Sequence, residues 1–335
     1  MSITKKINYM LSKLGHSIVS NSVLYDWQRG ISNLSTETVK PPEGAIDYLN
    51  LKNERLHDLR QRYSVFQEKV SIPIVWTDEY VHSYSLLSFR GDNCYVWQTR
   101  DPNCADINYC LTAYYAELND RIGILEKNKE DGLFGVHTYT VDSRLVSRDL
   151  LDSSVELNFL EKNLKLSSIE NLSILDIGAG YGRLACRTAN AFSNLSTYIC
   201  TDAVPESTFL SEYHVRFRKL DNTVTVVPLD EIETVLKNQK IDIAVNIHSF
   251  SECTLDAIEW WLKLISSAEI QHLFIVPNAS DHGGDKLALN SGEDFSFLVE
   301  KYGYKLRLKS PKYEDPLVQK YGVSPTYYYL FQLKS

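Results

Sequence analysis

The C-terminal half of the chain alternates short apolar segments with helical ones, and this alternation constrains the fold more than any other feature. From residue 171 onward, five apolar runs are bounded by turn residues, at 173–178, 197–202, 224–229, 242–248 and 272–278. Helical segments separate most of them, as in parallel strands joined by crossover helices. Two further runs, at 304–310 and 326–334, predict a closing antiparallel hairpin. The sequence therefore predicts an α/β fold with a Rossmann-like, doubly wound, mostly parallel sheet and a C-terminal antiparallel hairpin.

A capped helix is expected to lead into the first strand. Ser147 is a suitable N-cap, Asp149 lies in the first turn where the helix dipole favours negative charge, and apolar positions continue to about Leu166. We place a domain boundary just before this helix, so that residues 146–335 form the core. Residues 1–145 show helical spacing in several places and are expected to form a mainly helical region that caps the substrate.

The segment LDIGAGYGRLA at 175–185 places a glycine-rich turn between the first strand and the next helix. Glycine is needed where the backbone turns sharply and a ligand lies against it. Asp176 precedes the turn, and Asp202 ends the second strand. Because strand ends face the ligand crevice of a doubly wound sheet, both carboxylates are expected beside a ligand. The carboxylate of Asp202 is expected to accept hydrogen bonds from the two hydroxyls of a ribose.

Two cofactor classes compete for such a turn. Nicotinamide dinucleotides carry a pyrophosphate and use the spacing G-x-G-x-x-G, but this sequence has G-x-G-x-G with an acid next to it. S-adenosylmethionine has no phosphate and carries an ammonium group and a sulfonium centre, so a nearby carboxylate favours it. We predict S-adenosylmethionine as the cofactor. The residues expected to bind it in and around the turn are Asp176, Gly178, Ala179, Gly180, Tyr181, Arg183, Asp202 and Ala203.

The ends of the third and fourth strands supply further candidates. Leu229 and Asp230 are expected near the adenine, and Asn246 is expected to bind the methionine portion or the acceptor. His248 is the predicted general base for an alcohol acceptor, because a base that removes the hydroxyl proton assists attack. Glu252, four residues later, is predicted to orient the imidazole if a helix begins there.

Two other interpretations of this region stay open. A histidine at a strand end is often purely structural. Asp281, His282 and Asp285 could instead hold a divalent cation, although we predict no metal site. Trp260 and Trp261 are expected to pack within a helix rather than to bind substrate.

Several of these segments together resemble the family of bacterial sugar O-methyltransferases, over about residues 95 to 335. The segments are LDIGAGYGRLACR, TD-x-VP-x-S at 201–207, NIHSFSE at 246–252, FIVPN at 274–278, WQTRD at 97–101, LTAYYAE at 111–117, EDGLFGV at 130–136 and SRDLLDS-x-x-E at 147–156. The resemblance implies transfer of a methyl group to a hydroxyl of a sugar or sugar-containing precursor, often in surface-polysaccharide or glycan pathways. The first 90 residues resemble no family.

A sugar site needs planar hydrogen-bonding side chains and aromatic faces, and polar motifs just before the core supply both. The residues predicted to bind substrate are Gln98, Arg100, Asp131, Phe134, Ser249 and Asn278. Arg148 is predicted to clamp the carboxylate of the cofactor, since arginine forms bidentate pairs. The alternative is that the polar residues before the core only form hydrogen bonds within loops and helix caps and bind no ligand.

Composition excludes some classes of function. The net charge is -8 and no dense run of basic residues occurs, so nucleic acid is not an expected partner. The sequence contains no run of about 18 apolar residues, so we expect no membrane span. The six cysteines form no C-x-x-C pair, which is typical of reduced thiols in a cytoplasmic protein. The expected partner is a sugar or sugar nucleotide, and the oligomeric state, a homodimer included, is left open.

Three alternatives to a sugar O-methyltransferase remain at this stage. The first is a methyltransferase acting on a non-sugar small molecule or an amine. The second is a non-catalytic partner protein that binds the cofactor. The third is a dinucleotide-dependent oxidoreductase.

Overall fold

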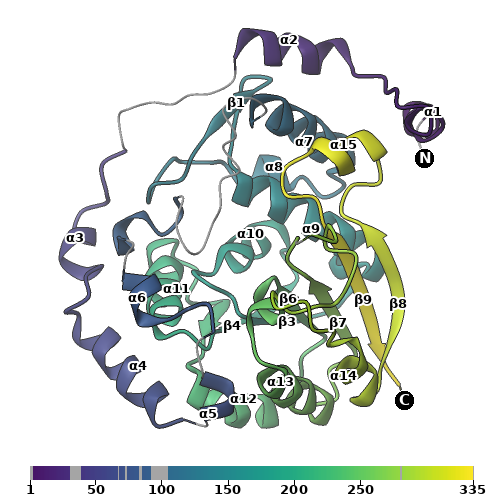
Figure 1. Ribbon diagram of the computed structural model, residues 1–335. Helices are drawn as coiled ribbons and strands as arrows, with labels where there is room; N and C mark the ends of the chain where they lie inside the picture. The colour runs from purple at the N-terminus through teal and green to yellow at the C-terminus, as the bar shows by residue number, and fades with distance from the viewer. Residues whose placement is uncertain are drawn as a thin grey trace.

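The computed structural model describes residues 3–30, 39–66, 68–71, 74–82, 85–91, 105–279 and 281–334. A seven-stranded sheet with the order β5-β4-β3-β6-β7-β9-β8 lies at the centre of the C-terminal half (Figure 1). Its strands are β3 (Leu172–Ile177), β4 (Leu195–Thr201), β5 (Val224–Val226), β6 (Ile243–Ile247), β7 (His272–Val276), β8 (Tyr304–Pro311) and β9 (Tyr327–Leu333). A separate two-stranded sheet pairs β1 (Tyr139–Val141) with β2 (Arg144–Val146).

The topology confirms the predicted doubly wound, mostly parallel sheet. Strands β3 to β7 are parallel, and β9 is antiparallel to both of its neighbours. The predicted antiparallel pairing of the last two strands is confirmed, with helix α15 (Pro316–Tyr321) between them in the chain. The strand order reverses between β3 and β6, because the chain builds outward through β4 and β5 before crossing back. Ligands of such sheets bind at this reversal, outside the carboxyl ends of the strands.

Alternating side chains of the strands bury the two faces of the sheet in two separate cores. Ile174 faces the core formed with α9 (Arg148–Leu164) and α10 (Arg183–Ala191), whereas Leu175 faces the opposite one. The remaining helices of this half are α11 (Pro205–Phe217), α12 (Ile232–Asn238), α13 (Leu255–Ser267), α14 (Ser296–Lys301) and the 3-10 turns η2 (Leu166–Ser168), η3 (Leu229–Glu231) and η4 (Ser249–Glu252).

Helix α9 begins where the sequence predicts. The Oγ atom of Ser147 accepts a hydrogen bond from the backbone N–H of Leu150, which caps the helix. The helix ends at Leu164, two residues before the predicted end, because Lys165 takes a left-handed conformation with φ of 57°.

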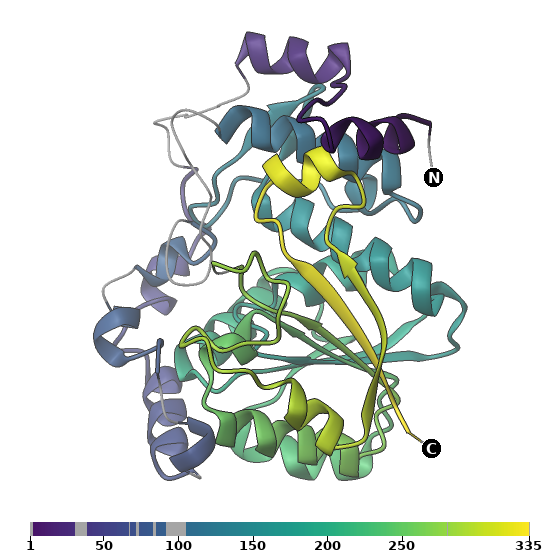
Figure 2. The same cartoon turned by 45° about the vertical axis from the view of Figure 1, so that its right-hand side comes forward.

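The N-terminal region is mainly helical and packs on both cores. Val23 and Tyr109 belong to the core on the α9 side, and Leu56 and Leu59 belong to the opposite one. Figure 1 shows α3 to α6 along one side of the sheet, and Figure 2 shows α1, α2 and α7 stacked at one end of the molecule. The elements are α1 (Ile3–Ser12), α2 (Asn21–Arg29), α3 (Ala45–Tyr48), α4 (Glu54–Ser64), α5 (Glu68–Ser71), α6 (Asp78–His82), η1 (Leu86–Ser88), α7 (Ala105–Asn119) and α8 (Ile124–Lys127).

Candidate functional site

The glycine turn leaves the carboxyl end of β3 and enters α10, and it is most crowded at Gly178. The backbone N–H groups of Gly178 and Ala179 both donate to the carbonyl oxygen of Thr201 on β4. Gly178 has φ of 75°, and a Cβ atom there would lie 2.2 Å from Oγ of Ser249. The end of β6 therefore presses against the turn, and only glycine fits at this position.

Two buried carboxyl groups flank the turn. Asp176 accepts a hydrogen bond of 2.8 Å from Oη of Tyr198, and Asp202 accepts 2.9 Å bonds from the N–H groups of Gly180 and Val204. Burial raises the pKa of both carboxyls to about 7, although these hydrogen bonds oppose the rise. Neither carboxyl forms an ion pair with a side chain in the described ranges. A cation bound beside them would reduce the cost of ionising them.

A cavity of about 1080 Å³ opens at the carboxyl ends of the central strands. Pockets for single small ligands measure roughly 300–1,000 Å³, so this cavity has room for two reactants. Most of the predicted site residues line it: Arg148, Asp176, Gly178, Ala179, Gly180, Tyr181, Arg183, Asp202, Ala203, His248, Ser249, Glu252 and Asn278.

His248 lies in a strained position at the end of β6. Its φ is 69°, which is unusual for a residue with a side chain and is often found at functional sites. Its Nδ1 atom lies 3.3 Å from the carbonyl oxygen of Pro277. Burial lowers the pKa of His248 to about 3, and the charge of Arg148 adds to this effect. The imidazole is therefore neutral near pH 7. A proton on Nδ1, donated to Pro277, leaves Nε2 as an acceptor.

Glu252 does not contact His248 as predicted. Its Oε2 atom accepts a 2.6 Å hydrogen bond from the indole N–H of Trp76, and its Oε1 atom accepts a 2.9 Å bond from the amide of Asn278. The expected pairing assumed an α-helical turn from residue 248, but the chain forms the 3-10 turn η4 here. Burial raises the pKa of Glu252 against these two hydrogen bonds. Glu252 therefore links the N-terminal region to the strand ends.

Arg148 and Arg183 both reach the cavity, and both are compensated within the protein. The Nη1 atom of Arg183 lies 2.9 Å from the carboxylate of Glu156. Arg148 pairs with Asp152 at 3.2 Å and donates to Oγ of Ser324 at 3.0 Å. Neither arginine offers an uncompensated positive charge to a phosphate group.

Leu229 and Asp230, predicted near the adenine, lie outside the cavity. The backbone N–H of Leu229 donates to Oη of Tyr63 at 2.9 Å, and the Leu229 side chain is fully buried. The two carboxylate oxygens of Asp230 accept hydrogen bonds of 2.9 Å from Arg62. The structure does not bring these two residues to the cavity, because helix α4 covers the loop after β5.

Asn246, predicted to bind the cofactor or the acceptor, also lies outside the cavity and is fully buried. Its amide donates to the carbonyl oxygen of Ile177 at 2.9 Å and to Oγ of Ser249 at 2.6 Å. Its oxygen accepts from the N–H of Phe250 at 3.0 Å. Asn246 holds the ends of β3 and β6 together, and both of its N–H donors are used within the protein.

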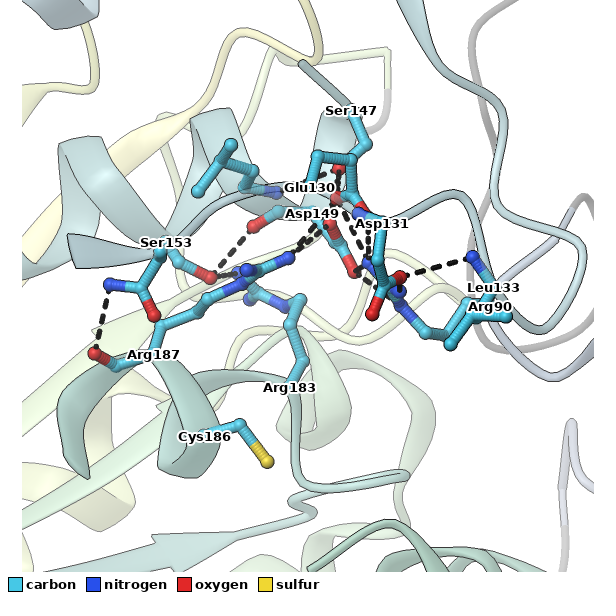
Figure 3. Close-up of polar contacts among 12 residues, drawn as sticks. Arg90, Glu130, Asp131, Leu133, Ser147, Asp149, Ser153, Arg183, Cys186 and Arg187 are labelled. Carbon is cyan, nitrogen blue, oxygen red and sulfur yellow. Dashed lines mark hydrogen bonds and ion pairs between the residues drawn. The ribbon is translucent and has the colours of Figure 1, made fainter. Parts of the chain in front are cut away.

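Asp131, predicted to bind substrate, belongs to a buried ion cluster behind the glycine turn. Figure 3 shows Glu130, Asp131 and Asp149 converging on Arg90, with N···O distances of 2.9, 3.0 and 3.0 Å respectively. Oη of Tyr181 donates to Asp149 at 2.8 Å, so the cluster also holds the glycine turn. We call it the Arg90 cluster. Its members are Arg90, Glu130, Asp131, Ser147, Asp149, Arg187 and Arg218.

Phe134, also predicted to bind substrate, is buried in an aromatic group next to this cluster. Its ring stacks on Phe89 with a centroid distance of 4.6 Å and meets Phe217 edge-on at 5.1 Å. Its side chain is buried and does not line the cavity. Gln98 and Arg100, the remaining predicted substrate residues, lie outside the described residues.

The N-terminal region contributes a whole wall of the cavity that the sequence did not reveal. Its cavity-lining residues are Arg60, Tyr63, Ser64, Phe66, Val70, Ser71, Ile74, Val75, Trp76, Asp78 and Tyr80. Trp261, expected only to pack within its helix, lines the cavity as well. The aromatic residues of segment 63–80 are the one signal that could have suggested this wall.

Two absences concern only the parts of the chain that the structure describes. There, no group of three or more His, Cys, Asp or Glu side chains is arranged to hold a metal ion. His282 and Asp285 lie 3.5 Å apart, as an isolated pair. The same ranges contain no helix with the length and apolarity that crossing a bilayer requires.

No protein-family model matches this chain. A release factor glutamine methyltransferase from Flavobacterium psychrophilum is 30% identical over 117 residues, which are 35% of this chain and 40% of that protein. The chain thus matches less than half the length of this relative.

Several solved structures align with about half of the chain or more. A SAM-dependent methyltransferase from Aquifex aeolicus covers 55% of this chain and 98% of its own, with 16% identity and a TM-score of 0.40. The mitomycin 7-O-methyltransferase covers 56% of this chain and 57% of its own, with 18% identity and a TM-score of 0.38. The [4+2]-cyclase SpnF covers 66% of this chain and 93% of its own, with 13% identity and a TM-score of 0.40. The assignment of the fold rests on the sheet topology itself.

Proposed function

We propose that this protein is an S-adenosylmethionine-dependent methyltransferase. The observation that carries the proposal is the pair Asp176 and Asp202, buried beside the glycine turn without a cationic partner in the described ranges. A pyrophosphate would lie against these carboxyls and meet only compensated arginines, whereas S-adenosylmethionine brings an ammonium and a sulfonium group. The sequence relative, itself a methyltransferase by name, supports the same chemistry.

The residues around the turn fit this cofactor. Asp202 keeps lone pairs for the ribose hydroxyls after accepting its two backbone bonds, and Asp176 supplies negative charge for the ammonium group. Arg148 lines the cavity and would share its guanidinium between Asp152 and the cofactor carboxylate. When bound, the cofactor supplies a methyl group on a positively charged sulfur.

His248 is the proposed general base. Its imidazole is neutral near pH 7, and its Nε2 atom can accept the proton that an acceptor hydroxyl loses during attack. The low pKa makes it a weak base, so we expect most of the rate to come from holding the two reactants in line.

We propose a hydroxyl of a sugar or sugar-containing precursor as the acceptor. The wall beside His248 combines the aromatic ring of Trp76 with planar polar groups of Glu252, Asn278 and Asn290. Such a set suits a ring that presents both C–H faces and hydroxyls, and the sequence resemblance supports this acceptor class.

The test is a methyl-transfer assay with a panel of nucleotide sugars, followed by the mass and linkage of the product. His248→Ala should lower turnover by about 100-fold or more and leave cofactor affinity nearly unchanged. Cofactor binding with no turnover on any hydroxylated precursor would contradict the sugar assignment. Turnover that His248→Ala does not change would remove the proposed base.

The sequence relative favours a second acceptor, a side-chain amide such as that of glutamine. Against this, Asn246, the buried amide at the end of β6 that could pair with an acceptor amide, does not line the cavity and uses both N–H donors within the protein. The linkage of the methyl group in the product, O–CH₃ or N–CH₃, decides between the two acceptors.

A further inference from the structure

Helix α1 presents apolar side chains to solvent. Tyr9 is 58% exposed, Met10 61% and Leu14 72%, and Ile18, beyond the end of the helix, is 46% exposed. Single exposed apolar residues are common on protein surfaces, but an exposed set this close together in the chain marks an interaction site. We define the α1 patch as the exposed residues Lys6, Tyr9, Met10, Lys13, Leu14 and Ile18.

Another face of α1 attaches the helix to the rest of the protein. The buried side chain of Asn8 accepts a 2.7 Å hydrogen bond from the backbone N–H of Ile18 and donates to the carbonyl oxygen of Ile18 at 3.1 Å. Helix α1 packs against α15, beside it in Figure 2, and the following Val19 and Val23 pack in the core on the α9 side. The α1 patch is therefore held in place and faces outward.

Basic residues accompany the exposed apolar side chains. Residues 1–25 contain three lysines and no aspartate or glutamate, whereas the whole chain has a net charge of -8. Lys6 and Lys13 are exposed, and the ammonium group of Lys13 lies 5.0 Å from the ring centre of Tyr9. Lys6 precedes Met10 by one helical turn, so basic and apolar side chains share one face of the helix. The α1 patch is thus both apolar and positively charged.

A lipid surface suits this composition better than a protein does. Lysine is depleted at protein–protein interfaces relative to the rest of the surface. At a membrane surface lysine is favoured, because its stem packs along apolar groups while its ammonium group reaches the headgroups. Tyrosine and tryptophan are enriched at the same level, and Tyr25 and Trp27 are exposed on the next helix, α2. The positive charge selects a membrane with anionic lipids.

We propose that the α1 patch docks this protein reversibly on an anionic membrane surface. Met10, Leu14 and Ile18 enter the boundary between headgroups and acyl chains, and Lys6 and Lys13 contact the lipid phosphates. The inference goes beyond the proposed function and does not depend on it, since no residue of the patch lines the cavity.

Sedimentation of the full chain with lipid vesicles tests the electrostatic part of the docking. The protein should bind vesicles of equal parts phosphatidylcholine and phosphatidylglycerol more tightly than vesicles of phosphatidylcholine alone, and salt should weaken the binding. Lys6→Gln combined with Lys13→Gln should lower the partition coefficient about 25-fold, at about fivefold for each lysine. The matched control is Lys263→Gln with Lys305→Gln, which removes the same charge from exposed positions of α13 and β8 and should change the coefficient little.

A second variant tests the apolar part of the docking. Leu14→Asp should lower the partition coefficient by about tenfold or more, because it removes an inserted side chain and adds a repelled charge. Phe297→Asp is the control, since Phe297 is 53% exposed on α14 and outside the α1 patch, and it should leave the coefficient nearly unchanged. Both positions are exposed, so circular dichroism should show both variants folded.

The outcomes separate the lipid surface from other occupants of the α1 patch. Absence of binding to the anionic vesicles, or equal binding by Leu14→Asp and the unaltered protein, overturns the docking. A dimer of the unaltered protein that Leu14→Asp dissociates in sedimentation velocity would make a second copy the occupant, and it also overturns the membrane assignment. Methyl transfer measured without vesicles is a separate readout, so failure of the docking leaves the proposed function intact.

Discussion

Two groups of carboxylates contact the glycine turn, and their pKa values shift in opposite directions. In the Arg90 cluster, burial alone would raise the pKa of Asp149, but Arg90 and Arg187 hold that pKa well below its usual range. In the cavity, burial raises the pKa of Asp176 and of Asp202 to about 7, because only neutral donors contact them. Asp149, Asp176 and Asp202 are all buried.

Charge balance separates structural acids from ligand-binding acids in this protein. The Arg90 cluster is balanced, since its three arginines face three carboxylates: Arg90, Arg187 and Arg218 against Glu130, Asp131 and Asp149. The cavity pair has no such balance within the described residues. A cluster with equal numbers of arginines and carboxylates stabilises the fold. A carboxylate pair without a cationic partner is instead stabilised in its ionised form when a cationic ligand binds.

Breaking the balanced cluster should have the largest effect. Arg90→Met leaves the buried carboxylates short of one cation, and removing one partner of a buried ion pair costs about 3–5 kcal/mol. We expect the free energy of unfolding, measured by chemical denaturation, to fall by that amount.

The control for this variant is Lys162→Met, which removes a partner of Glu314 on the surface. Exposed pairs contribute about 0–1 kcal/mol, so its stability should stay close to that of the unaltered protein. Equal effects of the two variants would show that the Arg90 cluster is not a structural unit.

Altering the unbalanced pair should change binding more than stability. Asp202→Asn should weaken S-adenosylmethionine binding by about 1–3 kcal/mol, the cost of unpaired hydrogen-bonding groups. Asp58→Asn removes a half-exposed carboxylate outside the cavity and serves as the control in the same calorimetric titration. Unchanged affinity in Asp202→Asn would mean that the cofactor does not reach the end of β4.

The pH dependence of stability gives a smaller, independent readout of the same residue. The pKa of Asp202 is about 7 in the folded protein and about 3.9 in an unfolded chain. Asp202 therefore binds more protons in the folded protein between these values, and its own contribution to stability falls as the pH rises from about 4 to 7. Asp202→Asn should flatten this loss in denaturation curves. A loss of the same steepness in the variant would mean that another group causes it.

The sequence predicts the parts of the site that local rules determine. Strand periodicity and the glycine spacing place Asp176, Gly178 and Asp202 at the carboxyl ends of the parallel strands. This prediction requires no knowledge of any distant contact. His248 follows from the same rule, because it ends the fourth parallel strand of the predicted core.

The parts that the sequence misses depend on where distant segments dock. Leu229 was expected beside the cofactor, but Tyr63, 166 residues earlier, covers it. Asp131 was expected beside the substrate, but Arg90 and Arg218 hold it in a buried cluster. A polar residue in a short motif can serve a ligand or a fold equally well, and only the location of its partners decides.

If Asp176 and Asp202 bind a cationic ligand, their carboxyl groups should release protons when that ligand binds. Titration with S-adenosylmethionine between about pH 5.5 and 7, in two buffers of different ionisation enthalpy, measures that exchange. The site carboxyls have a pKa of about 7 when empty, and a cationic ligand lowers it, so binding should release protons and tighten as the pH rises. Proton uptake on binding, or affinity that falls as the pH rises, would contradict the account.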